Sequence, residues 1–440
     1  MTKSKIHQQI EEYVAQQTQA LLDYVRDRGR LAVVKAPPGS GKTYLLMQAV
    51  RAASKERQRI AIATQTRSQA DDICRRLMQD FNITPIRFAA ASSARVKTPY
   101  PVVTEKGDLP DTRPCVVVAT SAKWGMISLA HPFDVLFVDE AWQLAWADFM
   151  LLGQVAGRFV LIGDPGQIPP VVTIDTGRWE TSPRAPHHPA PEHVLRQAPR
   201  DLLKLDLPAT RRLPADTVEY IRPFYDFPFK AFAQPGERLI RLSGRSRDGI
   251  DAALDRLESG SVVALTLRTQ AEGPPLEDDA EIAELAANVA ARLLERNGET
   301  VMGGESGALE PHDIGLCATH RVMNAAIQQR LPARLRKHMN VDTPERWQGL
   351  ERKAMVIAHP LSGVTDPSDF DLETGRLCVM ASRHKAGLII VARDHIRHTL
   401  DTHLPIAEQP VGRPDVAGRG HYQNSTLWSR LVTQDRVVAL

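Results

Sequence analysis

Cysteine is scarce in this sequence, with four residues among 440: Cys74, Cys115, Cys317 and Cys378. They lie far apart and show no paired spacing, so neither a zinc cluster nor a disulfide framework is indicated. Each lies in or beside an apolar run, where cysteine behaves as a small buried hydrophobic residue. We therefore expect free, buried thiols, as in proteins of the reducing cytoplasm.

Long apolar runs are lacking as well. No run approaches the roughly 20 residues of a membrane-spanning helix, and the first ten residues lack the apolar core of a signal peptide. We expect a cytoplasmic protein without a membrane partner. The formal net charge is only +3, which does not by itself predict a polyanionic partner, although basic side chains can still cluster in one groove.

Short apolar runs, separated by helical patterns, are what the sequence does contain. Continuous apolar runs are typical of strands buried on both faces, and their alternation with helices favours parallel α/β sheets. Two series of such runs predict two α/β domains. The first series is 31–35, 60–64, 115–120, 134–138 and 158–163, and the second is 203–207, 262–266, 314–318, 354–358 and 388–392.

The expected domain boundaries follow from these series. The first domain takes residues 1–200, the second residues 201–400, and a tail with a short helix around 425–432 takes residues 401–440. The polar stretch 174–200, rich in Pro and His, reads as an exposed loop. Its histidines, His187, His188 and His193, have no Cys or carboxylate at ligand spacing, so a metal site is not favoured. Further breaks are expected at 270–275 and 409–420.

The strongest local signal is APPGSGKT at residues 36–43, which follows a predicted strand and opens a helix. This is the context of a phosphate-binding P-loop, in which small residues let backbone N–H groups wrap a phosphate. Lys42 would contact the β- and γ-phosphates of ATP, and the Thr43 hydroxyl would bind Mg²⁺. The expected nucleotide-binding residues of this loop are Pro38, Gly39, Ser40, Gly41, Lys42, Thr43 and Tyr44.

Two further strands end in polar residues. In FDVLFVDEAWQ, Asp139 and Glu140 follow an apolar run, and buried acids usually have a partner. Asp139 would hold Mg²⁺ through water, and Glu140 would polarise the attacking water. In VLIGDPGQIPP, Gln167 would orient that water or sense the γ-phosphate. Taken alone, this last segment would be an ordinary turn.

These three motifs, in this order, resemble those of superfamily 1 helicases. The nearest branch is the one of the nonsense-mediated-decay helicase and the replication helicase-nucleases, here in a minimal, bacterial-looking form. The resemblance continues in IATQTRSQADDICRRL (motif Ia), TRRLP (motif IV), VDTPERWQGLE (motif V) and RLCVMASRHKAGLIIVAR (motif VI) and covers residues 17–393. It implies two tandem RecA-like P-loop domains with parallel sheets that bind ATP and Mg²⁺ between them.

The resemblance also implies roles for residues of the second half. Arg212 and Arg383 would be arginine fingers on the γ-phosphate, although alone they would read as surface ion pairs. Gly349 and Glu351 would contact the ribose or the phosphates. Gln17 resembles an upstream glutamine that reads adenine.

The sequence departs from the family pattern in several places. Arg211 stands where an adenine-stacking aromatic is usual, and Trp347 replaces a Phe. Ser382 and His384 flank the motif VI arginine. Residues 82–114 are too few for the β-barrel that larger relatives insert there.

The resemblance further implies a single-stranded DNA or RNA partner. The candidate contacts are Thr64, Thr66, Arg67, Thr120 and Trp124, with the basic stretch 329–338 as a further candidate. Trp124 could equally be a core residue, Trp347 is expected in the core, and the basic stretch could be only a solvated helix face. We expect an ATP-dependent 5′–3′ translocase or helicase. The alternative is a nucleotide-controlled switch that signals to a protein partner.

Overall fold

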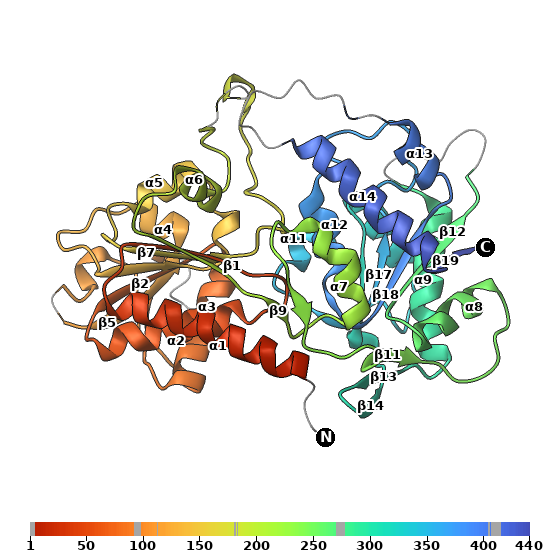
Figure 1. Ribbon diagram of the computed structural model, residues 1–440, viewed down its shortest axis with the longest axis horizontal. Helices are drawn as coiled ribbons and strands as arrows, with labels where there is room; N and C mark the ends of the chain where they lie inside the picture. The colour runs from red at the N-terminus through yellow and green to blue at the C-terminus, as the bar shows by residue number, and fades with distance from the viewer. Residues whose placement is uncertain are drawn as a thin grey trace. The chain divides into compact units, whose positions relative to one another are not determined.

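The computed structural model describes residues 5–91, 98–111, 113–179, 182, 184–269, 278–403, 405 and 415–440. Within these residues the chain forms two compact units (Figure 1). The first comprises 5–165 and 169–209, and the second comprises 166–168, 210–405 and 415–440. The predicted break at 270–275 lies outside the described residues, as do residues 409–414 of the predicted break at 409–420.

The first unit is built on an eight-stranded sheet of order β4-β3-β5-β2-β6-β7-β1-β8. All of its strand pairs are parallel, as the continuous apolar runs predict. The strands are β1 (Leu31–Lys35), β2 (Arg59–Thr64), β3 (Ile86–Phe88), β4 (Val102–Val103), β5 (Cys115–Thr120), β6 (Val135–Val138), β7 (Phe159–Gly163) and β8 (Leu202–Asp206).

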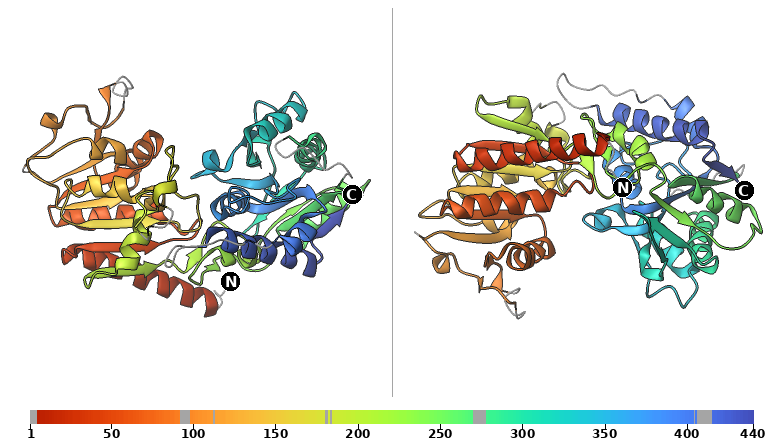
Figure 2. Two further views of the ribbon diagram at one scale, coloured as in Figure 1. Left: turned by 90° about the horizontal axis from the view of Figure 1, so that it is seen from above. Right: turned by 60° about the horizontal axis from the view of Figure 1, so that its bottom comes forward.

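Helices cover both faces of this sheet. Successive strand residues point to opposite faces, so Ala32 and Val34 pack in one core and Val33 in the other. Figure 2 shows α1 and α2 side by side on one face. The helices are α1 (Lys5–Arg26), α2 (Lys42–Lys55), α3 (Arg67–Phe81), α4 (Ser121–Gly125), α5 (Trp146–Leu152) and α6 (Ala190–Gln197).

The second unit has a six-stranded sheet of order β16-β15-β17-β18-β12-β19. Its strands also pair in parallel throughout, so the chain is a tandem of two parallel, RecA-like α/β domains. The strands are β12 (Val262–Leu267), β15 (Ile314–Cys317), β16 (Asn340–Asp342), β17 (Arg352–Ala358), β18 (His384–Arg393) and β19 (Val437–Ala439). Smaller pairings join β9 (Ala209–Thr210) to β10 (Lys230–Ala231), and β11 (Arg238–Arg241) to β13 (Glu299–Met302) and β14 (Glu305–Ala308).

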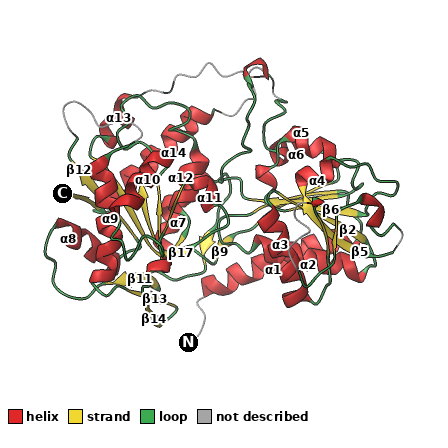
Figure 3. Ribbon diagram, turned by 180° about the vertical axis from the view of Figure 1, so that it is seen from behind, coloured by secondary structure: helices red, strands yellow, loops and turns green. Residues whose placement is uncertain are grey.

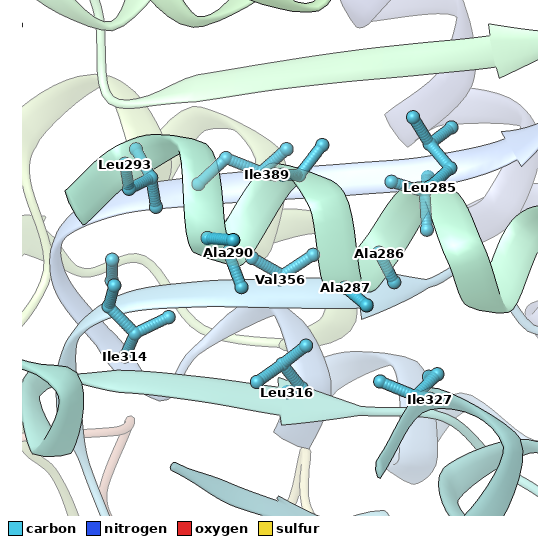
Figure 4. Packing of buried hydrophobic residues seen from close by; sticks show 14 of the residues in the cluster. Leu285, Ala286, Ala287, Ala290, Leu293, Ile314, Leu316, Ile327, Val356 and Ile389 are labelled. Atoms are coloured by element: carbon cyan, nitrogen blue, oxygen red, sulfur yellow. The ribbon is translucent and has the colours of Figure 1, made fainter. Parts of the chain in front are cut away.

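Helices lie on both faces of the second sheet as well (Figure 3). On one face α9 presents small residues such as Ala286 and Ala290, which let it approach Val356 and Ile389 closely (Figure 4). On the other face α7, α12 and α14 pack over β12, β17 and β18. The helices are α7 (Ala215–Ile221), α8 (Gly249–Asp255), α9 (Ala280–Glu295), α10 (Arg321–Arg330), α11 (Pro344–Trp347), α12 (Thr374–Ala381), α13 (Ile396–Thr402) and α14 (Val416–Thr433).

Three sequence expectations differ from this architecture. The run 203–207 was expected to open the second sheet, but it forms β8 and pairs with β1 in the first. The short helix expected around 425–432 is the 18-residue α14, and the chain then adds β19 beside β12. The polar stretch 174–200 contains α6, whose buried face includes Val194 and His193.

Candidate active site

The P-loop joins β1 to α2 at the carboxyl edge of the first sheet. Gly39 and Gly41 have φ of 70° and 90°, a left-handed conformation that glycine adopts at little cost. Gly41 is the N-cap of α2 and offers no side-chain cap, so the first N–H groups of the helix remain available to an anion. The buried Ser40 Oγ has no hydrogen-bond partner among the described residues. Open helix N–H groups and an orphaned hydroxyl fit a phosphate chain.

Lys42 and Glu140 form an ion pair at the same edge. Lys42 Nζ lies 2.9 Å from Glu140 Oε2, and the two side chains are 11 % and 15 % exposed. Because β6 and β1 lie on either side of β7 in the parallel sheet, the ends of β1 and β6 carry the P-loop and the two acids to one edge. Lys42 and Glu140, both expected at the phosphate site, therefore lie together, while their catalytic roles stay a prediction.

Asp139 lies beside this pair and is 6 % exposed. Its burial, together with the neighbouring Glu140 charge, raises the pKa of Asp139 to about 7, and Lys42 acts in the opposite direction. A divalent cation favours the charged carboxylate, so Asp139 and the partly buried Thr43 hydroxyl suit Mg²⁺. Glu140 itself has φ of 50°, a strained value for a side-chain-bearing residue that is often found at functional sites.

The turn after β7 explains one glycine and places Gln167. A Cβ on Gly163 would lie 2.8 Å from the Ala141 backbone nitrogen, so only glycine lets the segment after Glu140 pack here. Gln167 is buried, at 6 % exposed, in the segment Gly166–Ile168, which belongs to the second unit. That Gln167 orients the attacking water or senses the γ-phosphate stays a prediction.

The second unit carries a cluster of cations around one carboxylate. Arg212 Nε donates to Glu351 Oε2 at 2.8 Å, and Lys385 Nζ lies 2.5 Å from Glu351 Oε1. Arg238 donates to the Arg212 carbonyl. Burial raises the pKa of Glu351, but Arg212 and Lys385 outweigh it and hold the pKa below its usual value. Three cations facing one carboxylate leave an excess of positive charge, which suits a polyphosphate.

Arg383 starts the segment that leads into β18 and is 1 % exposed. Its Nε donates to the Val379 carbonyl at 3.3 Å, and Arg212 Nη1 donates to the neighbouring Ser382 carbonyl at 3.3 Å. The structure therefore brings the segments of both predicted arginine fingers together within the second unit. Arg212, with a 13 % exposed side chain, is the more accessible of the two.

Behind Arg383, His384 is fully buried and joins a polar network. His384 Nε2 lies 2.8 Å from Thr217 Oγ1, and Thr217 Oγ1 lies 2.6 Å from Ser261 Oγ. Burial, helped by the charges of Arg212 and Arg238, lowers the pKa of His384 to about 3. A neutral imidazole thus supports the start of β18.

The other predicted nucleotide contacts are more dispersed. Arg211 is exposed, and its guanidinium carbon lies 3.9 Å from the centroid of the Phe232 ring. Gly349 has φ of 78° and no atom within 4 Å of a Cβ built on it, so the residue serves the backbone turn before Glu351. Gln17 is partly exposed on α1, and Tyr44 is 61 % exposed.

The predicted nucleic-acid residues divide into accessible and structural ones. Thr66 is the N-cap of α3 and accepts from Gln69 N, Arg67 is exposed, and Thr120 caps α4. Thr66 and Arg67 follow β2 and Thr120 ends β5. Because these two parallel strands are neighbours, the three residues share one edge of the sheet. Thr64, in contrast, is fully buried, and its hydroxyl donates to the Thr66 carbonyl at 3.0 Å.

Trp124 is the clearest correction to the nucleic-acid set. Its side chain is fully buried, its Nε1 donates to the Ile62 carbonyl at 2.9 Å, and its ring packs against Phe88 and Phe133. No base can stack on a ring that the core encloses. Trp347 is also fully buried, as expected.

The basic stretch 329–338 and the histidines of the stretch 174–200 were the two remaining candidates, for nucleic-acid binding and for a metal site. In the basic stretch, Arg334 has a 71 % exposed side chain, whereas Arg336 donates to the Leu331 carbonyl. His193 is buried, its Nε2 donates to the Ala185 carbonyl at 3.0 Å, and its ring stacks on Trp146. Among the described residues, no group of three or more His, Cys, Asp or Glu side chains could hold a metal ion.

Sequence reasoning missed Arg238, Lys385 and Phe232. Arg238 and Phe232 lie in or beside the short strands β11 and β10, which carry no motif. Lys385 lies within motif VI, two residues after Arg383, and this position was the available signal.

Comparisons with known proteins agree with a P-loop protein. Residues 12–205 match the AAA domain family, a range that holds the P-loop and both acids. The chain is 26 % identical over 168 residues to the DNA replication ATP-dependent helicase/nuclease DNA2 of Saccharomyces cerevisiae, covering 36 % of this chain and 11 % of that protein.

The solved structures that match this chain are distant from it. An arterivirus nonstructural protein 10 helicase is 14 % identical, with a TM-score of 0.43, over 84 % of this chain and 61 % of that one. The helicase MrfA bound to DNA and AMPPNP is 11 % identical, with a TM-score of 0.37, over 93 % and 54 %. This chain thus spans about a tenth of the yeast relative and less than two thirds of these two structures. Among the described residues, no helix has the length and apolar character needed to cross a membrane.

Proposed function

We propose that this chain is an ATP-driven motor that moves along single-stranded DNA or RNA. The observation that carries the proposal is the Lys42–Glu140 pair beside Asp139, at the open N-terminus of α2. A lysine, an acid and a second, buried acid at the end of neighbouring parallel strands are the groups that ATP hydrolysis needs. The similarity to helicases over part of the chain supports the choice of a nucleic-acid motor.

The Lys42–Glu140 ion pair suggests how the site responds to substrate. A phosphate chain offers Lys42 more negative charge than a single carboxylate does, so Lys42 leaves Glu140 when the nucleotide binds. Glu140 is then free to accept a proton from the attacking water. Asp139 and Thr43 would hold Mg²⁺, which neutralises charge that develops on the phosphates.

The cations of the second unit would complete the reaction. In this proposal Arg212 exchanges Glu351 for the γ-phosphate, and Arg383 supports the same charge. Cations brought to the phosphate by a second domain couple hydrolysis to domain closure. Alternating closure and opening would move a strand held at Thr66, Arg67 and Thr120, in the 5′–3′ direction by resemblance.

The phosphate site is tested by ATP hydrolysis with Mg²⁺ in the parent and in Lys42→Ala. The substitution removes the cation that meets the phosphates, so hydrolysis is expected to fall to background. Lys55→Ala, at the exposed far end of the same helix, is the matched control and is expected to retain parental turnover. Equal turnover in Lys42→Ala and the parent would overturn the assignment.

A further inference from the structure

The segment that follows α10 carries exposed cations on the second unit. Arg330 ends α10, and Arg334, Arg336 and Lys337 follow before β16 begins. All four residues are exposed. Residues 314–341 contain no Asp or Glu, so this part of the chain supplies no carboxylate that would neutralise these charges. We refer to the four residues as the α10-turn cations.

Two of the α10-turn cations have a structural role at the end of the helix. Gln328 Nε2 donates to the Arg336 carbonyl at 2.7 Å, and Arg336 Nε donates to the Leu331 carbonyl at 2.8 Å, so the segment folds back against α10. Arg330 Nη1 donates to the Ala326 carbonyl at 3.1 Å. Basic side chains commonly satisfy the last carbonyls of a helix, and this accounts for Arg330 and Arg336.

Arg334 and Lys337 have no such role. Arg334 Nη2 lies 3.8 Å from Glu295 Oε1 at the end of α9, and the two side chains are 71 % and 42 % exposed. An exposed pair at this separation contributes little to stability. Within the described part of the chain, Lys337 forms no ion pair. A charge run is often only a solvated helix face, but these two cations lie beyond the helix, in a segment whose backbone is held against it.

The surroundings of the α10-turn cations also lack an aromatic surface. Residues 314–341 contain no Phe, Tyr or Trp. The two exposed aromatic side chains among the described residues of this unit, Phe370 and Tyr422, lie elsewhere. Phe370 packs against His320 at the opposite end of α10, and Tyr422 belongs to α14, on the other face of the sheet. Single strands are held by charge together with stacking on aromatic rings, so this surface offers nothing for unpaired bases.

Double-stranded nucleic acid fits such a surface. Its bases are already stacked inside the duplex, and its two strands present about one negative charge per 1.7 Å of helix axis. Arg and Lys contact these phosphates without reading the sequence. Cations that face neither carboxylates nor aromatic rings therefore favour a duplex backbone over a single strand.

We propose that the α10-turn cations bind the phosphate backbone of double-stranded nucleic acid, separately from the edge of the first unit that carries Thr66, Arg67 and Thr120. The inference rests on the proposed function in taking the polyanion to be nucleic acid. It adds a second form of that partner, a duplex, to the single strand on which the motor moves. Binding is independent of base sequence and weakens with salt.

The test measures the affinity of the full chain for a blunt-ended DNA duplex and for oligo(dT) with the same number of phosphates, across a salt series without nucleotide. The double variant Arg334→Gln, Lys337→Gln should bind the duplex about tenfold more weakly or worse at low salt. The slope of log K against log salt should become shallower by about two, since each lost phosphate contact removes roughly 0.9. Affinity for oligo(dT), and its stimulation of ATP hydrolysis, should stay at the parental values.

A second double variant, Arg245→Gln with Arg419→Gln, is the matched control. It removes the same charge from exposed residues of the same unit, and Arg419 lies on α14, on the other face of the sheet. Both affinities should stay parental in this control. Thermal unfolding of the two double variants should match that of the parent, because all four substituted side chains are exposed.

Parental duplex affinity in Arg334→Gln, Lys337→Gln would overturn the inference. An equal loss for the duplex and for oligo(dT) would also do so, because the surface would then not select a duplex. Binding of the parent to phosphatidylserine vesicles that this variant loses, with duplex binding intact, would assign the cations to a membrane surface instead. A parent whose ATP hydrolysis does not respond to oligo(dT) would overturn the proposed function, and a selective loss of duplex binding in the variant would still support the inference.

Discussion

At the scale of single residues, Glu140 concentrates most of the proposed chemistry. It pairs with Lys42 at 2.9 Å and adopts a left-handed backbone conformation, with φ of 50°. Such a conformation costs of order 1–3 kcal/mol and persists where the surrounding structure fixes it. The close packing of Gly163 against Ala141 is what fixes the turn here.

Glu140→Gln is expected to abolish hydrolysis while ATP still binds. The amide keeps the size of the side chain but cannot accept a proton from water, and Lys42 remains to meet the phosphates. Equilibrium binding of a fluorescent ATP analogue and steady-state phosphate release measure the two properties separately. Asp148→Asn, at an exposed acid of α5, serves as the control. Parental turnover in Glu140→Gln would remove its role.

Arg383 makes a second prediction at this scale. Arg383→Ala should leave ATP binding largely intact and slow turnover by roughly 10³-fold, the size of an arginine-finger effect. Because the side chain is 1 % exposed, thermal unfolding is measured alongside, and Arg383→Lys, which keeps the charge, separates folding from catalysis. Near-normal turnover in a folded Arg383→Ala protein would mean that the residue is structural.

At the scale of elements, the buried histidines at the two ends of the second sheet's central strands have a consequence for stability. His384 begins β18, and His359 follows β17. Burial lowers the pKa of both to about 3, with Arg212 and Arg238 adding to the effect at His384 and His395 at His359. Both are neutral in the folded chain, whereas an unfolded chain protonates them near pH 6.5.

Stability should therefore fall as the pH drops below 6.5. Above pH 6.5 the two histidines are neutral in both the folded and the unfolded state. Between pH 6.5 and 3 only the unfolded state binds the protons, so protonation stabilises the unfolded state and the free energy of unfolding decreases. Urea unfolding at pH 8, 7, 6 and 5 should show a constant midpoint down to pH 7 and a declining one below. In a double variant, His359→Gln and His384→Gln, the unfolding midpoint should decline less steeply with falling pH. His312→Gln changes an exposed side chain and should show the same decline as the parent. An equal slope in the double variant would contradict the account.

The elements also show what the sequence could and could not predict. Runs such as 115–120 are buried on both faces, so apolar content alone identifies them as strands. β19 has three residues and β10 has two, too few for any periodicity. Trp124 could not be placed from the sequence for a different reason. Its position just after a strand suggested a surface on which a base could stack, but Phe88 and Phe133 from other parts of the chain enclose its ring in the core.

At the scale of the whole molecule, the proposed nucleotide-driven motor takes residues from both units. The first unit carries the P-loop, both acids and the edge with Thr66, Arg67 and Thr120. The second carries a cation cluster that no single motif revealed, because Arg212, Arg238, Glu351 and Lys385 come from four separate segments. The P-loop was predictable because its residues are contiguous, whereas the cluster depends on the fold.

The most direct test of the motor is the steady-state rate of ATP hydrolysis with and without a single-stranded oligonucleotide, measured across a salt series with both DNA and RNA. We expect the oligonucleotide to raise the rate. The stimulation should decline as salt increases, because phosphate contacts then gain less from counterion release. Arg67→Ala should weaken the stimulation without lowering the basal rate. Hydrolysis that proceeds at one rate with every oligonucleotide, at low and high salt alike, would contradict the motor and leave a nucleotide-controlled switch.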